Sequence, residues 1–165
     1  MKTPVPAFGN DRVRLRLLEE TDLETTMAWR NRDEIRRWFK NPGVVTLEGH
    51  RGWFRQYAQS DNDFIFIVES EGVAVGQVSI YAIDRAAGDA EIGRFIAAPG
   101  CEGKGHMKSA IGVLMDWAHA ELGLSRVHLE VFASNARAIG LYQSCGFAVT
   151  GNADGMIKME RSLPC

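Results

Sequence analysis

Residues 102–110 carry the pattern that points most directly to chemistry. They read Glu-Gly-Lys-Gly-His-Met-Lys-Ser-Ala and lead into a long segment with helical apolar periodicity. Gly103 and Gly105 let a ligand approach the backbone closely, and the first amides of a helix have no intrahelical partner. Lys104 and Lys108 add positive charge beside the helix dipole. The pattern predicts a phosphate-binding loop, with a plain helix-capping loop whose lysines face solvent as the alternative.

Two familiar phosphate motifs are excluded by the spacing. A P-loop requires two glycines separated by four residues and followed by Lys and Ser or Thr, which this segment does not match. The dinucleotide fingerprint requires a third glycine where this chain has Lys108, and it belongs to an early βαβ unit.

The rest of the chain must position this loop. Strands are expected over residues 12–18, 64–69, 73–82, 89–97, 126–132, 147–150 and 156–161, and helices over 21–30, 33–39, 46–59, 104–122 and 135–144. Thr21, Thr46 and Asn135 are the expected N-caps, and Gly123 ends the fourth helix. Strands alternate with helices only in the second half, which predicts an α/β fold with a mixed sheet and helices on both faces.

Composition limits the classes of partner. The 165 residues predict a single domain over 1–165, and the net charge of −2 does not favour nucleic acid or a membrane surface. Cys101, Cys145 and Cys165 lack paired spacing and are expected to be free thiols in a reducing compartment. No apolar run approaches the roughly 20 residues of a membrane span, and residues 1–10 lack a signal-peptide layout. We therefore expect a cytoplasmic protein.

Four segments in order resemble the GCN5-related N-acetyltransferase (GNAT) superfamily. They are residues 91–96, 102–118, 127–131 and 135–147, and the last resembles the signature N-x-x-A-I-x-L-Y-x-x-x-G-F. The resemblance covers about residues 12–161. The family's loop pattern is Q/R-x-x-G-x-G/A, and this chain departs from it with Glu102 at the first position and Met107 at the last. A glutamate beside a pyrophosphate is unfavourable, and Met107 is expected to crowd the turn.

The resemblance implies a mostly antiparallel seven-stranded sheet that splays between its fourth and fifth strands, and acetyl-CoA as co-substrate. Pantetheine would pair with the free strand edge, and the pyrophosphate would meet the loop amides. The implied coenzyme-binding residues are Phe95, Ile96, Ala97, Gly103, Lys104, Gly105, His106, Met107, Lys108, Asn135 and Tyr142. Tyr142 is the implied general acid for the departing thiolate, with simple core packing as the alternative.

The resemblance also implies a general base among the carboxylates of the fourth expected strand, acting directly or through water. Glu91 lies where family members often carry a base, and Asp89 lies two residues earlier on the same face. Either could instead be a solvated strand-end carboxylate. His50, His119 and His128 have no metal-ligand spacing, so we expect no metal.

Residues 28–41 are expected to form the acceptor wall, the side of the active site that faces the amine substrate. They hold five basic and two acidic residues. The run resembles amino-sugar nucleotide N-acetyltransferases of the pseudaminic acid pathway, which implies transfer to the 4-amino group of a nucleotide-linked amino-deoxy sugar by direct attack in a ternary complex. A nucleoside diphosphate would dock on Arg30, Arg36 or Arg37. The expected substrate-binding residues are Trp29, Arg30, Asn31, Arg37 and Trp38.

Other readings of the acceptor wall stay open. The tryptophans and Ile35 could enter the core and leave the arginines in solvent. The N-terminal half also resembles ribosomal-protein alanine acetyltransferases and aminoglycoside acetyltransferases, although a polycationic antibiotic favours an acidic cleft. An acyl-CoA-binding sensor domain without transfer activity is an alternative of another class, and a homodimer is left open.

Overall fold

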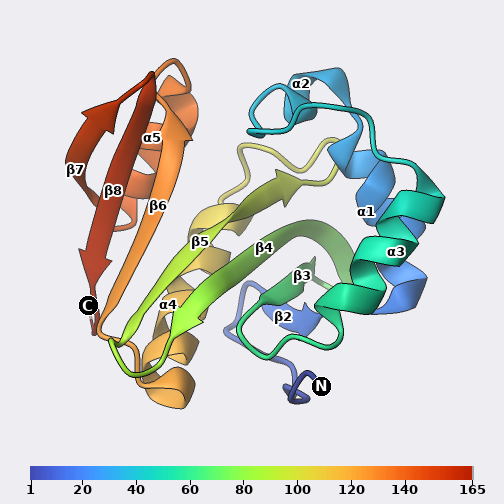
Figure 1. Ribbon diagram of the computed structural model, residues 1–165, viewed down its shortest axis with the longest axis horizontal. Coiled ribbons are helices and arrows are strands. Elements are labelled where there is room, and N and C mark those ends of the chain that lie inside the picture. The colour runs from blue at the N-terminus through green and yellow to red at the C-terminus, as the bar shows by residue number, and fades with distance from the viewer. Residues whose placement is uncertain (165) are drawn as a thin grey trace.

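The computed structural model describes residues 1–164 and has one sheet in the order β1-β2-β3-β4-β5-β6-β8-β7 (Figure 1). Its strands are β1 (Phe8–Gly9), β2 (Arg14–Leu17), β3 (Phe64–Ser70), β4 (Val73–Asp84), β5 (Asp89–Ala97), β6 (Arg126–Phe132), β7 (Ala148–Ala153) and β8 (Met156–Ser162). The sheet has eight strands, so the expected count of seven was wrong. The extra strand, β1, is too short for an alternating pattern, and the Phe8 ring stacks on Trp117 at 5.2 Å.

The helical elements are η1 (Glu20–Asp22), α1 (Leu23–Arg30), α2 (Asp33–Arg36), α3 (Leu47–Tyr57), α4 (His106–Leu122) and α5 (Ala136–Ser144). Thr46 caps α3 by accepting from the Gly49 amide, and Asn135 caps α5 in the same way, as predicted. The prediction of Thr21 as a cap was wrong. Glu19 and Asp22 form a capping box around η1 there, and α1 begins directly after it, at Leu23.

Helices cover both faces of the sheet, as expected. The buried face of α4, including Ile111 and Leu114, packs in the same core cluster as Phe66 and Ile80. On the opposite face, Leu23 of α1 and Tyr57 of α3 pack with Ile65 and Ile67. Successive residues of β3 therefore enter different cores, because side chains alternate across a strand.

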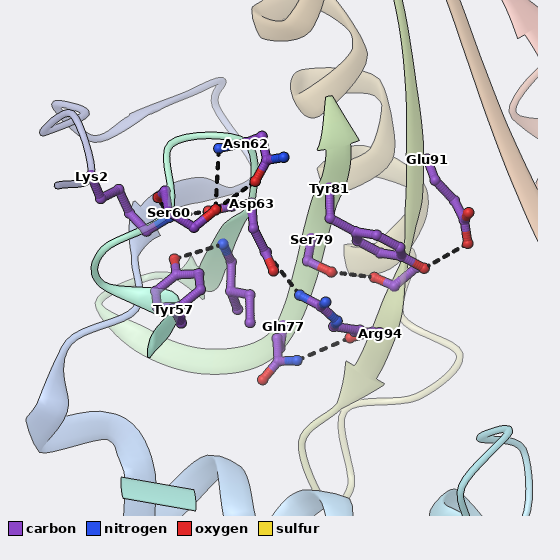
Figure 2. Close-up of polar contacts among 12 residues, drawn as sticks. Lys2, Tyr57, Ser60, Asn62, Asp63, Gln77, Ser79, Tyr81, Glu91 and Arg94 are labelled. Atoms are coloured by element: carbon purple, nitrogen blue, oxygen red, sulfur yellow. Dashed lines mark hydrogen bonds and ion pairs between the residues drawn. The ribbon is translucent and has the colours of Figure 1, made fainter. Parts of the chain in front are cut away.

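The expected splay between β5 and β6 is confirmed. These strands pair in parallel only where Asp89–Glu91 meets Arg126–His128, and they diverge beyond that point (Figure 1). All other pairs in the sheet are antiparallel. A bulge bends β5 at Arg94, whose φ is 55°. Gln77 Nε2 stabilises the bulge by donating to the Arg94 carbonyl at 3.1 Å (Figure 2).

Two further sequence predictions concern thiols and membranes. Cys101 and Cys145 are free, whereas Cys165 lies outside the described residues. In residues 1–164, we find no helix whose length and apolarity would let it cross a membrane.

Candidate active site

A cavity of about 890 Å³ opens between the diverging ends of β5 and β6. It brings together residues from α1, α2, β5, the loop before α4, β6 and α5. Thirteen of the predicted site residues line it: Arg30, Arg37, Trp38, Glu91, Phe95, Ala97, Gly103, Gly105, His106, Met107, Lys108, Asn135 and Tyr142. Segments more than one hundred residues apart in the sequence therefore line one cavity.

Four predicted side chains are not brought into the cavity. Trp29 and Ile96 are buried and pack together with Ala98. The Asn31 side chain exchanges two 2.8 Å hydrogen bonds with the backbone of Val45, which fixes the turn after α1. Lys104 is exposed, and its carbonyl accepts from Arg12 Nη2 at 3.2 Å. Trp29 thus packs in the core and Asn31 holds a turn, and their residue types alone did not indicate these structural roles.

The loop before α4 has the geometry of an anion cradle. Gly103 and Gly105 have φ values of 75° and 81°, which L side chains rarely adopt, and Gly105 directly precedes the first turn of α4. A Cβ at Gly105 would also lie 3.1 Å from Arg12 Nη2. His106, Lys108 and Arg137 line the same part of the cavity. These residues fit a pyrophosphate, which backbone amides and cations bind together.

The two departures from the loop pattern are accommodated by neighbouring residues. Met107 does not crowd the turn as expected; its Cε occupies the space that a side chain at position 76 would fill, and Gly76 leaves that space free. The carboxylate of Glu102 lies 3.6 Å from Arg32 Nη1, so an ion pair offsets its charge beside the loop.

Tyr142 projects from α5 into the cavity wall. It is 8% exposed, and its ring packs against Phe95 at 5.5 Å and Phe147 at 6.4 Å. Burial, with a smaller contribution from Cys145, raises the pKa of Tyr142 above its ordinary value, and like any tyrosine the side chain carries its proton at neutral pH. Among residues 1–164 the structure gives this hydroxyl no protein hydrogen-bond partner, which leaves it able to donate to a group in the cavity.

Glu91 is the candidate base that lines the cavity. Tyr81, directly opposite on β4, donates its hydroxyl to Glu91 Oε2 at 2.9 Å (Figure 2). His128 on β6 lies on the other side, with Nε2 3.6 Å from Glu91 Oε1. The carboxylate is therefore held between β4 and β6 at the point where β5 begins to separate from β6.

Asp89, the alternative base, faces a different set of partners. Its Oδ1 lies 3.2 Å from both Arg126 Nε and His128 Nδ1. Burial acts to raise the pKa of Asp89, but hydrogen bonds from Arg126 and His128 outweigh it and lower the pKa below its ordinary value. Asp89 is also not part of the cavity wall, so the geometry favours Glu91.

The acceptor wall uses its arginines unequally. Arg30 lies over the Phe39 ring at 4.2 Å and donates to the carbonyls of Asn41 and Gly43, so it organises its own loop. Arg36 pairs with Asp33 at 2.7 Å and lies outside the cavity wall. Arg37 lines the cavity with its guanidinium 4.8 Å from the Trp38 ring centre. Arg37 is thus the arginine most available to a ligand on this wall.

The sequence reasoning missed several residues of the site, including Arg137 in the anion cradle. Tyr81 orients Glu91, and Arg94 lies 4.3 Å from the Tyr81 ring while binding Asp63 at 2.8 Å (Figure 2). Arg32 reaches Glu102 from the turn between α1 and α2. Only the strand register could have placed Tyr81 opposite Glu91, and a sequence pattern does not carry that information.

A sheet splayed beside an anion cradle fits a coenzyme whose extended arm pairs with the strand edge and whose pyrophosphate meets the cradle, and the buried tyrosine and oriented carboxylate at the opening supply an acid and a base for acyl transfer to an amine. Comparison with known families agrees. The family model described as Acetyltransferase (GNAT) domain matches residues 12–148, and the chain belongs to this family. It is an acetyl-CoA-dependent N-acetyltransferase.

Among curated relatives, the spermidine N(1)-acetyltransferase of Escherichia coli (strain K12) is 30% identical over 140 residues, which are 84% of this chain and 74% of the relative. A putative ribosomal N-acetyltransferase of Bacillus subtilis (strain 168) is 29% identical over 156 residues, 89% of this chain and 84% of the relative. Among solved structures, spermidine N-acetyltransferase from Vibrio cholerae in complex with CoA and spermine has a TM-score of 0.84 at 25% identity, covering 93% of this chain and 96% of that one.

Proposed function

We propose that the enzyme acetylates a primary amine of a polyamine, with Glu91 as general base and Tyr142 as general acid. The observation that carries the proposal is the Glu91 carboxylate, which lines the cavity at the splay and is oriented by Tyr81. The spermidine acetyltransferases among the relatives support the choice of acceptor.

Carboxylates on the cavity wall can bind an ammonium group, although the acceptor side of the wall also carries the cations Arg30, Arg37 and Lys40. Glu34 of α2 and Glu130 of β6 join Glu91 on the wall, so carboxylates lie on both sides of the opening. Glu130 has Lys40 as its partner at 3.0 Å, while the Glu34 side chain is 63% exposed and 3.9 Å from Arg32. A long flexible cation could place one amine at Glu91 and exchange ion pairs with the outer carboxylates.

The chemistry then follows from the positions of two side chains. Acetyl-CoA supplies an activated thioester whose carbonyl carbon forms the new bond with the amine nitrogen. Glu91 takes the proton that the ammonium must lose before its lone pair can react and releases it to solvent, and it then takes the second proton that the nitrogen loses as the amide forms. Tyr142 donates its proton to the sulfur as the carbon–sulfur bond breaks, and the acid and the base are later reset by solvent.

A coenzyme-release assay tests the acceptor. Spermidine, spermine, a nucleotide-linked 4-amino sugar, the free amino sugar, an aminoglycoside and an alanine-terminated peptide would be compared at equal concentration. We expect the highest kcat/KM for spermidine or spermine. A higher value for any other amine would overturn the polyamine assignment and leave the acetyltransferase assignment standing.

A nucleotide-linked amino sugar is the second candidate, and Arg37 beside Trp38 favours it. A guanidinium binds a diphosphate in a bidentate way, and an indole ring can stack on a base. In this case the nucleotide-linked sugar would exceed both the polyamines and the free sugar in the same assay.

A further inference from the structure

Arg32 joins the acceptor wall to the coenzyme site. It lies between α1 and α2, and its side chain is 17% exposed. Its Nε donates to the Trp29 carbonyl at 3.1 Å, and its Nη2 donates to the carbonyl of Ala97, the last residue of β5. The remaining nitrogen, Nη1, faces Glu102 at 3.6 Å. One guanidinium thus contacts α1, the free end of β5 and the loop that precedes α4.

Glu102 needs such a partner because of where it lies. It lines the cavity next to Gly103, at the end where His106, Lys108 and Arg137 gather. A carboxylate without a counter-charge at this position would repel a pyrophosphate, and because the Glu102 side chain is 36% exposed, solvent screens part of that repulsion. Glu34 is the other carboxylate near Arg32, at 3.9 Å, but it is largely exposed.

We propose that Arg32 is a positioning residue for coenzyme binding, which neutralises Glu102 and holds the Ala97 end of β5 beside the phosphate loop. The loop position that is Gln or Arg in the family pattern is acidic here, and the positive charge comes instead from residue 32, seventy residues earlier in the chain. The inference concerns the coenzyme and is independent of which amine is the acceptor.

Calorimetric titration with acetyl-CoA tests the inference. We expect Arg32→Ala to raise the Kd by roughly tenfold, because it leaves Glu102 unpaired beside the pyrophosphate. Glu102→Gln alone leaves the Kd unchanged or lowers it. The double variant returns the Kd to within about threefold of wild type, because removing both charges also removes the repulsion. Acetylpantetheine, which lacks the pyrophosphate, should bind Arg32→Ala and Glu102→Gln/Arg32→Ala equally well.

A control ion pair elsewhere in the structure and a second variant of Arg32 complete the test. Arg85 and Asp61 form an ion pair of similar length, 3.9 Å, away from the cavity wall, so Arg85→Ala should not change the Kd. Arg32→Gln, which keeps donors but removes the charge, replaces Arg32→Ala if that variant does not fold. Equal weakening in the single and double variants would overturn charge neutralisation, and an unchanged Kd in Arg32→Gln would overturn the proposal entirely.

Discussion

The two walls of the cavity are built in different ways. The coenzyme wall comes from one continuous half of the chain, β5 to α5, and its ligand-facing groups are mainly backbone amides and a free strand edge. The acceptor wall comes from α1, α2 and the loop after them, and its ligand-facing groups are side chains. Several of these side chains already serve the loop itself, such as Arg30 with the Asn41 and Gly43 carbonyls.

This difference separates coenzyme binding, which depends on the backbone, from acceptor choice, which depends on individual side chains. Backbone groups bind the coenzyme in the same way whatever the neighbouring side chains are, provided glycine permits the turn. A side-chain wall can change its ligand by a few substitutions without disturbing the fold. Variants of the two walls should therefore differ in kind, and the largest effects should come from the coenzyme side.

Tyr142→Phe should give the largest effect. Loss of the proton donor should lower kcat by about 10²–10⁴-fold while the Kd for acetyl-CoA stays within twofold, because the ring still packs against Phe95. Steady-state kinetics and calorimetry measure the two quantities. A kcat within threefold of wild type would mean that water protonates the thiolate or that product release limits the rate.

Glu91 lies at the boundary between the two walls. Glu91→Gln should reduce kcat/KM by about 10²-fold at neutral pH. The loss should shrink as the pH rises, because the acceptor amine then arrives unprotonated and needs no base. Asp89→Asn provides the comparison, since it changes a carboxylate outside the cavity wall. A pH-independent loss in Glu91→Gln would assign Glu91 to substrate binding instead of proton removal.

Gly105→Asp should raise the Kd for acetyl-CoA by about 10- to 100-fold. The φ of 81° strains any L residue, and the new carboxylate would face the pyrophosphate. Lys104→Ala is the matched control, because Lys104 is exposed and lies outside the cavity wall. Equal effects of the two variants would contradict binding through backbone amides.

The same difference explains what the sequence could predict. The glycine loop, the Asn135 cap and the alternating strands are local signals, and the structure has each of them where the pattern put it. The splay followed from family resemblance, and the structure confirms it. The two-residue β1 has no periodicity of its own and depends on a distant ring, Trp117, so no local pattern could predict it.

The acceptor wall was harder to predict because its residue types have several uses. Trp29 and Trp38 look alike in sequence, yet one is buried at 6% exposure and the other lines the cavity. Arg30, Arg36 and Arg37 look alike too, and only their distances to carbonyls, Asp33 and Trp38 distinguish them. Tertiary contacts determine these roles, and they cannot be read from the pattern of a single sequence.

A modest effect on stability is expected at the end of the β5–β6 pair where the two strands still hydrogen-bond, which is where Asp89 lies. The pKa of Asp89 is lowered in the folded state, so its ionised form stabilises the fold above the unfolded pKa of about 3.9, and this contribution is lost as the pH falls through the folded value. Asp89→Asn should lower the urea midpoint at pH 7, and the difference from wild type should shrink towards pH 3. A difference that does not shrink between pH 7 and pH 3 would mean that packing, and not charge, holds this end.

Arg37→Ala should have the smallest effect on catalysis, and its sign distinguishes the two acceptors. An exposed charge contact contributes about 0.2–1 kcal/mol, or up to about fivefold in KM. With spermidine, removing Arg37 takes away a like charge, so the KM should stay unchanged or fall slightly, and added salt should reduce the difference between variant and wild type. With a nucleotide-linked sugar, the same change removes a partner of the diphosphate, so the KM should rise while the KM for the free sugar is unaffected.

Arg36→Ala is the matched control, because Arg36 pairs with Asp33 outside the cavity wall. A rise in KM confined to the nucleotide-linked sugar, together with a higher kcat/KM for that sugar than for spermidine, would transfer the assignment to the second candidate.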